Sequence, residues 1–492
     1  MAINIGIDFG TCFSEIGFYH GELMALKPSE EKTVMCPSVF YRDKDKKVVG
    51  TKAVISGKRN PQCMVEAVKK KLKEPAFGLD GELYEPRQIV QEIFQYLLEG
   101  ADESLCKEFQ KPDEELKVAI TVPVKFQEGE IRLIHEAAQS VRLNSGRKVT
   151  ITGVLKEPAA AALEYFGMQQ NKGENIFVYD LGGGTFDIAI MKSTGDAKKP
   201  YEVIDQDAKP IGGYNWDQKV EQLLRKKLLS AMIENGVEET VAEKQLTNVH
   251  LQKESREFKE NLSTAQVWSD EIEIRGEYYG VEITREEFEK SVESLKNQTM
   301  RTVKHLMEKH KDLEISQVIM VGGGSHMPHI RAAVEAYFKD VNVKSVKPEM
   351  AIAYGAARYA KMLEEVEKPL LQKAAHTYGI GFEDENGNKY IKNLIFKNQS
   401  LPAEAEVHCN VQRYNLIPVF ETECEAGNDR MDFEPGIMEI LQIHIIYGNG
   451  LPKGALKQIL TLKEDHTLEL TVTETDTGRS FSESIKLESK IR

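Results

Sequence analysis

The sequence predicts an α/β protein built as a duplicated domain pair, followed by an all-β domain. Over residues 1–365, strand-like apolar runs alternate with helical patterns. A unit of strand, Asp, Gly-rich turn and strand occurs twice, as "NIGIDFGTCFS" (4–14) and "NIFVYDLGGGTFDIAIM" (175–191). From residue 376 the pattern changes to short alternating runs separated by turn residues. The repeat predicts two similar halves, and the change in pattern predicts a domain of a different type.

Periodicity and turn residues predict the individual elements. "KVAITVPVKF" (117–126) has the continuous apolar character of a buried strand. Helical periodicity covers residues 128–141, 217–233, 285–310 and 351–368. Thr284 is the expected N-cap of the third helix, and Pro369 the expected stop of the fourth. "TLELTVTE" and "RSFSESIKL" flank Asp476-Thr477-Gly478 and predict a hairpin.

These patterns divide the chain into three parts. Residues 1–365 are expected to form the duplicated α/β part, residues 366–375 a linker, and residues 376–492 an all-β domain. The linker is placed where the α/β pattern ends, in the stretch "EEVEKPLLQKAA" (364–375).

Composition limits the classes of function. The chain is 41% hydrophobic and 29% charged with a net charge of −14, which disfavours a nucleic-acid partner because phosphate binding needs a basic surface. Basic runs such as "VKKKLK" (68–73) are interpreted as solvated helix faces. The six cysteines contain no CxxC pair, which predicts reduced thiols and no zinc site. With no leader pattern and no apolar run of about 20 residues, a cytoplasmic protein that does not enter a membrane is expected.

The two repeated turns have the chemistry of a polyphosphate site. Taken alone, the first turn is better explained as part of an ordinary β-hairpin. As a pair facing each other, they predict backbone N–H groups around phosphates, with Thr11 and Thr185 as hydroxyl donors. Asp8 and Asp180 would repel phosphate but suit Mg²⁺ held through its water shell. The P-loop and dinucleotide motifs are absent from the sequence.

Two further glycine turns are weaker signals. "QVIMVGGGSHMPHIRAAV" (317–334) runs from strand to turn to helix, and "KPIGGYNWD" (209–217) leads into a helix. Glycine in these places permits a nucleoside to lie against the backbone, or simply makes a tight turn.

Seven stretches in this order resemble the actin-like ATPases, and among them the heat-shock protein 70 (DnaK-type) chaperones. They span residue 3 to about residue 360 and are "IGIDFGT", "ITVPVKF", "EPAAAALEY", "VYDLGGGTFDI", "IGGYNWD", "VGGGSHMPHI" and "AIAYGAA". The resemblance implies an actin-like ATPase domain with two lobes around a nucleotide cleft. The β-rich segment 376–488 resembles the peptide-binding β-sandwich of the same family.

The resemblance also implies roles for individual residues. Lys69, which follows "NPQCMVEAV", Glu157, Asp180 and Thr185 take the catalytic positions, and Asp8, Asp180 and Asp187 those near the metal. Residues that match nucleotide-contacting positions are Asp8, Gly10, Thr11, Cys12, Gly182, Gly183, Gly184, Thr185, Gly212, Gly213, Arg256, Lys259, Ser263, Gly322, Gly323, Gly324, His326 and Glu349. Ile380 and Phe382 lie near positions that line the peptide site.

The chain departs from the family pattern inside the implied nucleotide site. Cys12 replaces a hydroxyl residue, and Glu260 stands where an arginine stacks on adenine. Arg256, one turn earlier, either replaces that arginine or pairs with Glu260 on the helix surface. Cys12 is either a small space-filling residue or a thiol whose pKa the turn amides lower. His326 stands where the family has arginine.

Other departures concern the connection between the domains. Ile131 replaces an arginine implicated in coupling, and "KPLLQK" keeps only two leucines of the linker. The sequence ends five residues after Leu487, so no helical lid is expected. These features predict that nucleotide has little influence on peptide binding.

The implied function is an ATP-hydrolysing, chaperone-like protein that uses ATP or ADP, Mg²⁺ and potassium. Its implied partners are extended or unfolded polypeptides, a J-domain co-chaperone and a nucleotide-exchange factor. The alternatives are an actin-like filament protein, a small-molecule kinase of the same fold, and a relative that binds nucleotide without coupling it to peptide.

Overall fold

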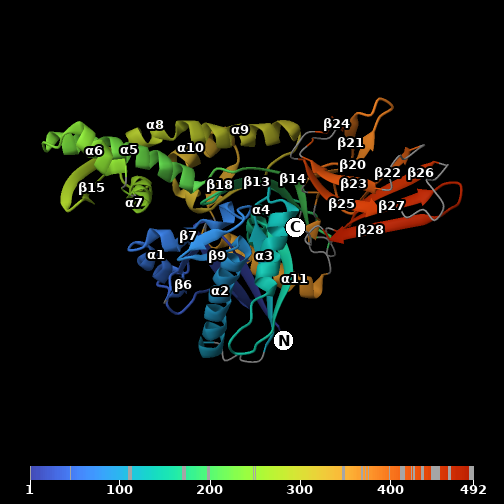
Figure 1. Cartoon of the computed structure of the whole chain (residues 1–492), viewed down its shortest axis with the longest axis horizontal. Helices are drawn as coiled ribbons and strands as arrows, with labels where there is room; N and C mark the ends of the chain where they lie inside the picture. The colour runs from blue at the N-terminus through green and yellow to red at the C-terminus, as the bar shows by residue number, and fades with distance from the viewer. Residues whose placement is uncertain are drawn as a thin grey trace.

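The computed structural model describes most of the chain (Figure 1). The described residues are 2–44, 46–108, 114–168, 173–196, 200–247, 249, 251–345, 349–366, 370–371, 373–374, 376–397, 399–409, 416–422, 424, 427–433, 437–444, 455–463 and 467–486.

A first mixed sheet is built by the N-terminal third of the chain. Its strands, in spatial order, are β11 (Val149–Lys156), β10 (Leu116–Val122), β1 (Ile3–Asp8), β2 (Phe13–His20) and β3 (Glu22–Leu26), with β4 (Cys36–Pro37) beside β2. β10 and β1 are parallel, whereas β1 and β2 are antiparallel. The helices α2 (Pro86–Glu108) and α3 (Glu128–Gln139) share one hydrophobic core with this sheet.

A small subdomain is inserted between β4 and α2. Its elements are β5 (Val39–Arg42), β6 (Lys47–Val49), α1 (Thr51–Gly57), the 3₁₀ turns η1 (Pro61–Cys63) and η2 (Val68–Lys70), β7 (Met64–Glu66), β8 (Phe77–Leu79) and β9 (Glu82–Tyr84). It places η2 beside the end of β1, because Lys69 of η2 contacts the carbonyl oxygen of Phe9, the residue after β1.

A second mixed sheet has the same strand order and directions as the first. Its strands are β18 (Asn342–Ser345), β17 (Gln317–Val321), β12 (Asn175–Leu181), β13 (Phe186–Ser193), β14 (Tyr201–Lys209) and β19 (Leu370–Leu371). β12 corresponds to β1, because it is parallel to β17 on one side and antiparallel to β13 on the other. The strand–Asp–turn–strand units found in the sequence therefore occupy equivalent places in two sheets.

The second sheet carries a larger helical insertion. Its elements are α5 (Gly213–Glu234), α6 (Glu239–Thr247), α7 (Gln252–Leu262), β15 (Val267–Ile274), β16 (Glu277–Thr284), α8 (Arg285–Ser291), α9 (Glu293–Lys309), η3 (Gly323–His326) and α10 (Pro328–Tyr337). α6 and β15 lie at the end of the molecule opposite the C-terminal sheets (Figure 1).

Two helices join the mixed sheets. α4 (Glu157–Met168) and α11 (Ala351–Glu365) are rich in alanine and share a core cluster with strands of both sheets. A Cβ atom added to Gly355 would lie 1.7 Å from the carbonyl oxygen of Ala160, so the two helices approach at a distance that only glycine allows. This contact sets how the ends of β1 and β12 face each other.

The C-terminal part consists of two antiparallel sheets over one core. One contains β24 (Arg430–Asp432), β21 (Lys389–Ile395), β20 (Thr377–Glu383), β23 (Leu416–Thr422) and β25 (Met438–His444); the other contains β22 (Ala403–Cys409), β26 (Leu456–Leu462), β27 (Thr467–Glu474) and β28 (Ser480–Lys486). Alternating residues of both sheets form a single apolar cluster.

The mixed α/β character predicted from the sequence is confirmed, with small errors at element ends. The predicted strand 117–126 ends at Val122, and the predicted helix 351–368 ends at Glu365; the expected stop, Pro369, lies outside the described residues. The predicted helix 285–310 is wrong as one unit, because it breaks at Val292 into α8 and α9. Thr284 does cap α8, accepting a hydrogen bond from the Glu287 N–H at 3.2 Å.

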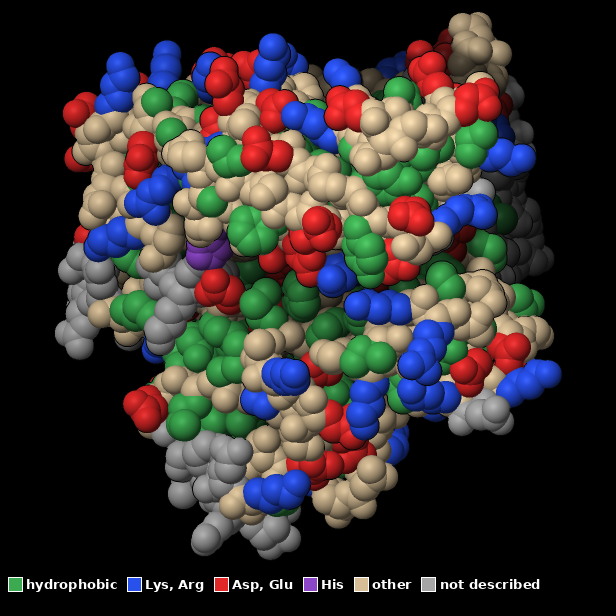
Figure 2. All heavy atoms as spheres, turned by 90° about the vertical axis from the view of Figure 1, so that its left-hand side faces the viewer, with side chains coloured by type: hydrophobic (Ala, Val, Ile, Leu, Met, Phe, Trp, Pro, Cys, Tyr) green, Lys and Arg blue, Asp and Glu red, His purple; other side chains and the backbone are tan. Residues whose placement is uncertain are grey.

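Charged side chains of both signs are interspersed on the face that Figure 2 shows. Among the described residues, no helix has the length and apolar character that a membrane span requires.

A buried histidine lies where α10 packs against α5. The Trp216 Nε1–H donates to Nε2 of His329 at 3.4 Å, and the ring packs edge-on against Phe288. The side chain of His329 is 6% exposed, and burial lowers its pKa from 6.5 to about 4. The folded protein therefore holds this ring neutral, as an acceptor for the tryptophan.

The burial of His329 predicts that the free energy of unfolding decreases at acidic pH. Between pH 6.5 and 4 the unfolded chain binds a proton at His329 that the folded chain rejects, so stability falls as pH falls through this window. We expect wild type to lose about 3 kcal/mol of unfolding free energy more than His329→Gln, which keeps an acceptor for Trp216. Urea unfolding followed by the fluorescence of Trp216 and Trp268, the two tryptophans of the chain, measures this loss. Parallel pH profiles for the two proteins would contradict it.

Candidate active site

The two Gly-rich turns of the repeat lie against each other. One follows β1 and contains Thr11, and the other follows β12 and contains residues 182–184. A Cβ atom added to Gly184 would lie 2.3 Å from the Thr11 Oγ1 atom. One added to Gly212, at the start of α5, would lie 2.6 Å from the backbone nitrogen of Gly184. Three backbone segments thus meet at a separation that excludes side chains.

These turns present backbone donors that the fold does not use. The N–H groups of Thr11, Cys12, Gly183 and Gly184 donate to no backbone carbonyl among the described residues. Backbone groups without partners are costly unless a ligand or water satisfies them. Adjacent free amides on two turns are an arrangement that binds anions such as phosphate.

Lys69 is directed inward by the small subdomain. Its side chain is 4% exposed, and Nζ lies 2.5 Å from Oε1 of Glu157, the first residue of α4. Nζ also donates to the carbonyl oxygen of Phe9. Ala67, just before η2, has φ of 52°, a left-handed conformation that is strained for a residue with a side chain. This local strain turns η2 so that Lys69 faces the turns.

The expectation that residues 68–73 form a solvated helix face is therefore wrong for Lys69, although Lys70 and Lys71 are exposed. Burial lowers the pKa of Lys69, but the carboxylates of Glu157 and Asp8 raise it above its usual value. The ammonium group is held charged next to the strand ends.

Carboxylates of both halves gather around this ammonium group. Oδ1 of Asp8 accepts a hydrogen bond from Thr121 Oγ1 at 2.9 Å, and Oδ1 of Asp187 accepts one from the Val124 N–H at 2.7 Å. Burial, followed by the charge of Glu157, raises the pKa of Asp8 and of Asp187 to about 7. The same two causes raise the pKa of Asp180 well above its usual range. The site is short of positive charge.

A divalent cation fits this charge distribution. Asp180 is 2% exposed, and neither of its carboxylate oxygens has a hydrogen-bond partner; Oδ2 of Asp187 is also unpartnered. Among the described residues, no group of three or more His, Cys, Asp or Glu side chains is placed to hold a metal on its own. Mg²⁺ is commonly bound by one or two carboxylates together with water and phosphate, which these residues allow.

Arg256 reaches from α7 to the turn after β1. Its guanidinium group lies 5.5 Å from the centre of the Phe13 ring, 3.8 Å from Sγ of Cys12 and 3.9 Å from Oδ2 of Asp217. Lys259 Nζ lies 2.6 Å from Oδ1 of the same aspartate. The structure gives Arg256 no ion pair with Glu260, so the surface-pair interpretation is not what this side chain does.

Cys12 does not have the properties of a reactive thiol. Burial raises its pKa above the usual value, and the positive charges of Arg256 and Lys259 only partly oppose this. The prediction that the turn amides lower the pKa of this thiol is therefore wrong. Cys12 packs against the second turn, since a Cβ atom on Gly183 would lie 2.9 Å from Sγ. The space-filling interpretation agrees with this contact.

The remaining predicted nucleotide contacts lie on surrounding elements. Ser263 caps α7 and donates to the Lys259 carbonyl oxygen at 3.0 Å. His326 in η3 lies 2.9 Å from Glu349; the histidine is exposed and the glutamate is half-buried. A Cβ atom on Gly322, which precedes η3, would lie 2.7 Å from Asp180 Oδ1, so the third glycine turn borders the carboxylate cluster. The other predicted glycines form the same four turns: Gly10, Gly182, Gly213, Gly323 and Gly324.

The predicted peptide-contacting residues have different environments. Ile380 is fully buried in the core shared by the C-terminal sheets. Phe382, two residues along β20, is half-buried and stacks on Tyr390 with ring centres 5.8 Å apart. The guanidinium group of Arg430 lies over the Tyr390 ring, 3.9 Å from its centre. Phe382 is thus the more accessible of the two predicted residues.

Sequence reasoning missed four residues of this site. Thr121 and Glu15 lie directly opposite Asp8 in the registers of β10 and β2. Asp217 forms ion pairs with both Arg256 and Lys259. Lys70 Nζ lies 5.1 Å from the centre of the Tyr214 ring. Polar residues inside apolar strands were a usable signal for the first two. The last two depend on tertiary contacts.

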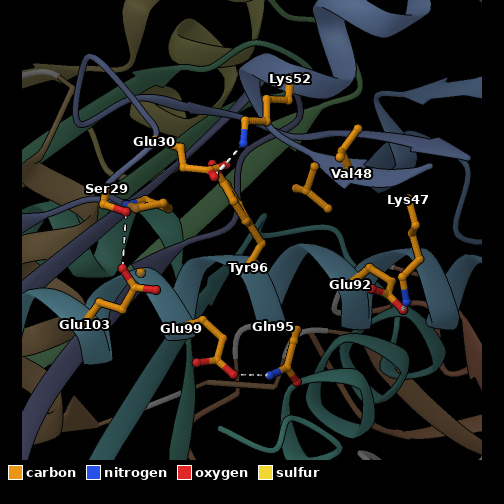
Figure 3. A pocket seen from close by; sticks show the side chains of 13 residues that line it. Ser29, Glu30, Lys47, Val48, Lys52, Glu92, Gln95, Tyr96, Glu99 and Glu103 are labelled. Carbon is orange, nitrogen blue, oxygen red and sulfur yellow. Dashed lines mark hydrogen bonds and ion pairs between the residues drawn. The ribbon is translucent and has the colours of Figure 1, made fainter. Parts of the chain in front are cut away.

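A separate hollow lies between the second half of α2, the segment that follows β3, and β6 with the start of α1 (Figure 3). Its volume is about 410 Å³, and its charged residues have partners: Lys47 pairs with Glu92 and Lys52 with Glu30, while Glu99 accepts a hydrogen bond from Gln95 and Glu103 accepts one from Ser29. With its charges satisfied, this hollow has none of the unpartnered groups seen between the turns.

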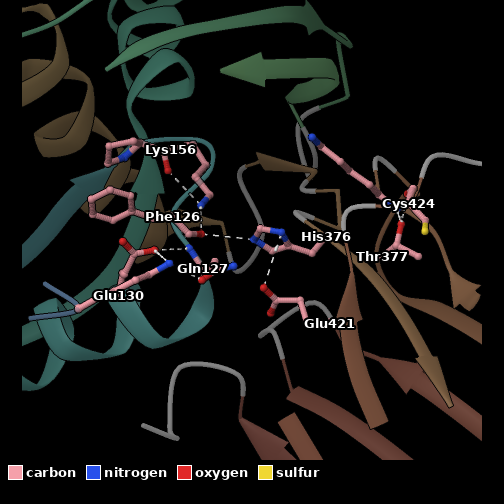
Figure 4. A network of polar contacts seen from close by, with 11 residues as sticks. Phe126, Gln127, Glu130, Lys156, His376, Thr377, Glu421 and Cys424 are labelled. Atoms are coloured by element: carbon pink, nitrogen blue, oxygen red, sulfur yellow. Dashed lines mark hydrogen bonds and ion pairs between the residues drawn. The ribbon is translucent and has the colours of Figure 1, made fainter. Parts of the chain in front are cut away.

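The C-terminal sheets are attached to the mixed sheets by polar contacts (Figure 4). Leu370 and Leu371 of the expected linker pair as β19 with the edge strand β14. His376 is 1% exposed; its Nε2 lies 3.5 Å from the Phe126 carbonyl oxygen and its Nδ1 lies 3.7 Å from Glu421 Oε1. Lys156 Nζ donates to the same Phe126 oxygen at 3.5 Å.

The comparisons with known proteins agree with this architecture. The family model described as "Hsp70 protein" matches residues 74–490, most of the chain. The chain therefore belongs to the Hsp70 family, which implies an actin-like ATPase fold.

Among individual relatives, the chain is 28% identical over 413 residues to the chaperone protein DnaK of Mycoplasma mycoides subsp. mycoides SC. That match covers 81% of this chain and 66% of the relative, so the chain spans about two thirds of the length of that curated protein.

The contacts of Arg256 predict its contribution to ligand affinity. Arg256→Ala removes the cation that lies over Phe13 and beside the Gly-rich turn after β1, and we expect about tenfold weaker ATP binding in calorimetry, within the range of a partly buried cation–π contact. Lys253→Ala, which removes an exposed cation from the same helix α7, is the control and should leave affinity unchanged. Equal affinities for wild type and Arg256→Ala would make Arg256 a surface residue.

Proposed function

We propose that this chain binds ATP between its two mixed sheets and hydrolyses it to ADP and phosphate. The observation that carries the proposal is the pair of glycine turns with unused amides, beside the buried Lys69–Glu157 pair. Family membership supports it. The two sheets then form the two lobes of a duplicated actin-like domain, residues 1–365, with the nucleotide cleft where the turns meet.

The residues divide the chemical work. The free amides of the turns after β1 and β12, with the hydroxyls of Thr11 and Thr185, bind the phosphates. Lys69 stabilises the negative charge that develops on the γ-phosphoryl oxygens, since a charge already fixed in place needs no reorganisation. Glu157, held by that lysine, positions the attacking water. When bound, Mg²⁺ neutralises phosphate charge, with Asp8, Asp180 and Asp187 as its supporting carboxylates.

The C-terminal sheets are proposed to bind extended polypeptide segments. Family membership and the paired antiparallel sheets over one core support a β-sandwich at residues 376–492. Such a domain takes an extended chain through backbone hydrogen bonds and a side-chain pocket, for which Phe382 is the accessible candidate. Chaperone activity, with a J-domain protein and a nucleotide-exchange factor as partners, follows by analogy with the relatives. A cytoplasmic location and a dependence on potassium are proposed on the same analogy.

Nucleotide and peptide sites are proposed to communicate through residues 366–375. β19 extends the edge of the sheet that carries Asp180, and His376 bridges the Phe126 loop and β23. Phe126 and Val124 belong to one loop, and Val124 binds Asp187 in the nucleotide site. A short series of contacts therefore runs from Asp187 to β23, which supports communication between the two proposed sites. These contacts support stronger coupling than the linker sequence predicts.

The hydrolysis proposal is tested at Lys69. Lys69→Ala should still bind ATP but turn over at least about a hundredfold more slowly, because removal of one such stabilising group costs about 2.7–4 kcal/mol. Single-turnover ATP hydrolysis measures this effect. Lys71→Ala is the matched control, since Lys71 lies two residues away and is exposed. Turnover of Lys69→Ala within a few-fold of wild type would remove the lysine from the mechanism.

The coupling proposal is tested at His376. We expect ATP to accelerate release of a fluorescent apolar peptide from wild type, and His376→Gln to reduce that acceleration by at least about fivefold, the lower end of ordinary coupling energies. His408→Gln, an exposed histidine of β22, is the control. Release kinetics by fluorescence anisotropy separate the cases. Release rates independent of nucleotide in wild type would support the weak coupling predicted from the linker instead.

A further inference from the structure

Glu15 is a buried carboxylate that the proposed hydrolysis does not use. It is the third residue of β2, between Ser14 and Ile16, and is 5% exposed. No hydrogen bond or ion pair to its carboxylate occurs among the described residues, and burial without a partner is costly for a charged group. A carboxyl group in this position must either take up a proton or be paired with a positively charged ligand.

The register of the first sheet places Glu15 beside Asp8. The two residues are directly opposite each other in the antiparallel pair β1–β2. Opposite residues point to the same face of a sheet, with Cβ atoms about 4.5–5.5 Å apart. The charged groups that act on Glu15 are those of the nucleotide site: Asp8, Lys69, Glu349 and Glu157. Glu15 thus faces the same space as the carboxylate of Asp8.

The charge in this space is unbalanced. Five carboxylates are less than one tenth exposed, namely Asp8, Glu15, Glu157, Asp180 and Asp187. Lys69 is the buried ammonium group among them, and its ion pair is with Glu157. The other four have no ion-pair partner among the described residues. Asp180 independently indicates a ligand, because both of its oxygens are buried without a hydrogen bond.

We propose that Glu15 is a second carboxylate for the divalent cation at Asp8, and that it allows the nucleotide-free protein to bind that cation. Mg²⁺ is usually held by one or two carboxylates with several waters, and affinity for divalent cations rises with the number of carboxylates. Two adjacent carboxylates on β1 and β2 meet this description without a third protein ligand. The inference rests on the proposed nucleotide site and adds a residue and a binding order to it.

The test measures cation binding directly, without nucleotide and without turnover. Mn²⁺ binding to the full chain, followed by electron paramagnetic resonance, should be at least about tenfold weaker in Glu15→Gln, the lower end of the effect of removing a supporting ligand. Glu474→Gln is the control, because it removes one charge from another buried glutamate, on β27. Its affinity should equal that of wild type.

Thermal unfolding supplies a second readout that a structural role would not reproduce. In EDTA, Glu15→Gln should unfold at a temperature equal to or above that of wild type, because the unpaired charge is gone. In excess Mg²⁺ the order should reverse, because wild type gains more from the cation. If Glu15→Gln were instead less stable in EDTA with unchanged Mn²⁺ affinity, Glu15 would be a second partner of Lys69 and the inference would be wrong.

Asp8→Asn separates this inference from the proposed function. If Asp8→Asn loses Mn²⁺ and Mg²⁺-dependent ATP binding while Glu15→Gln binds Mn²⁺ like wild type, the nucleotide site stands and the role of Glu15 is refuted. If neither variant changes cation or ATP binding, the proposed site is itself misplaced. Glu15→Asp, which withdraws the carboxylate by one methylene, replaces the glutamine variant if that variant fails to fold; wild-type Mn²⁺ affinity in it would also refute the role.

Discussion

The approach of three backbone segments, the turns after β1 and β12 and the start of α5, is the constraint on which the rest of the site depends. Gly184 lies so close to Thr11 and Gly212 that any side chain there would collide with backbone or hydroxyl atoms. The approach is possible because α4 and α11 also pack through glycine and alanine, and so hold the two sheets with their polar strand ends together. The N–H groups of Thr11, Cys12, Gly183 and Gly184 donate to no backbone carbonyl among the described residues, and free amides arranged in this way suit an anionic ligand.

The same closeness concentrates charge in a way that opposes folding. Carboxylates from two sheets surround one ammonium group, and burial raises the pKa of Asp8 and Asp187 to about 7. Such an arrangement is costly without a ligand, since each carboxylate must either take up a proton or remain unpaired. Perturbed carboxylates that converge in one place are typical of functional sites, where stability is given up for binding. A bound cation and polyphosphate would relieve both the excess negative charge and the unused amides.

The C-terminal sheets are joined to this site by more than a tether. β19 adds a strand to the edge of the second sheet, and Leu370 is buried in the core that α4 and α11 share. His376 is buried between the loop that contains Phe126 and strand β23. Buried polar contacts between domains are sensitive to small shifts because they have few alternative partners. The loop that contacts His376 also contacts Asp187 through Val124. One short segment, residues 124–126, therefore touches both the carboxylate cluster and the start of the C-terminal sheets.

Local chemistry in the sequence determined much of this protein. The repeated strand–Asp–turn–strand units, the position of Lys69 after "NPQ" and the Thr284 cap are patterns of neighbouring residues, and glycine, aspartate and threonine have narrow roles at such places. Long-range contacts decided the rest. Burial reversed the expected pKa shift of Cys12, and packing directed Arg256 to Phe13 and Asp217 instead of Glu260. Strand register brought Glu15 opposite Asp8, and edge pairing turned the leucines of the expected linker into β19. Desolvation, register and edge pairing depend on residues distant in the chain, and local pattern carries no information about which distant residues will meet.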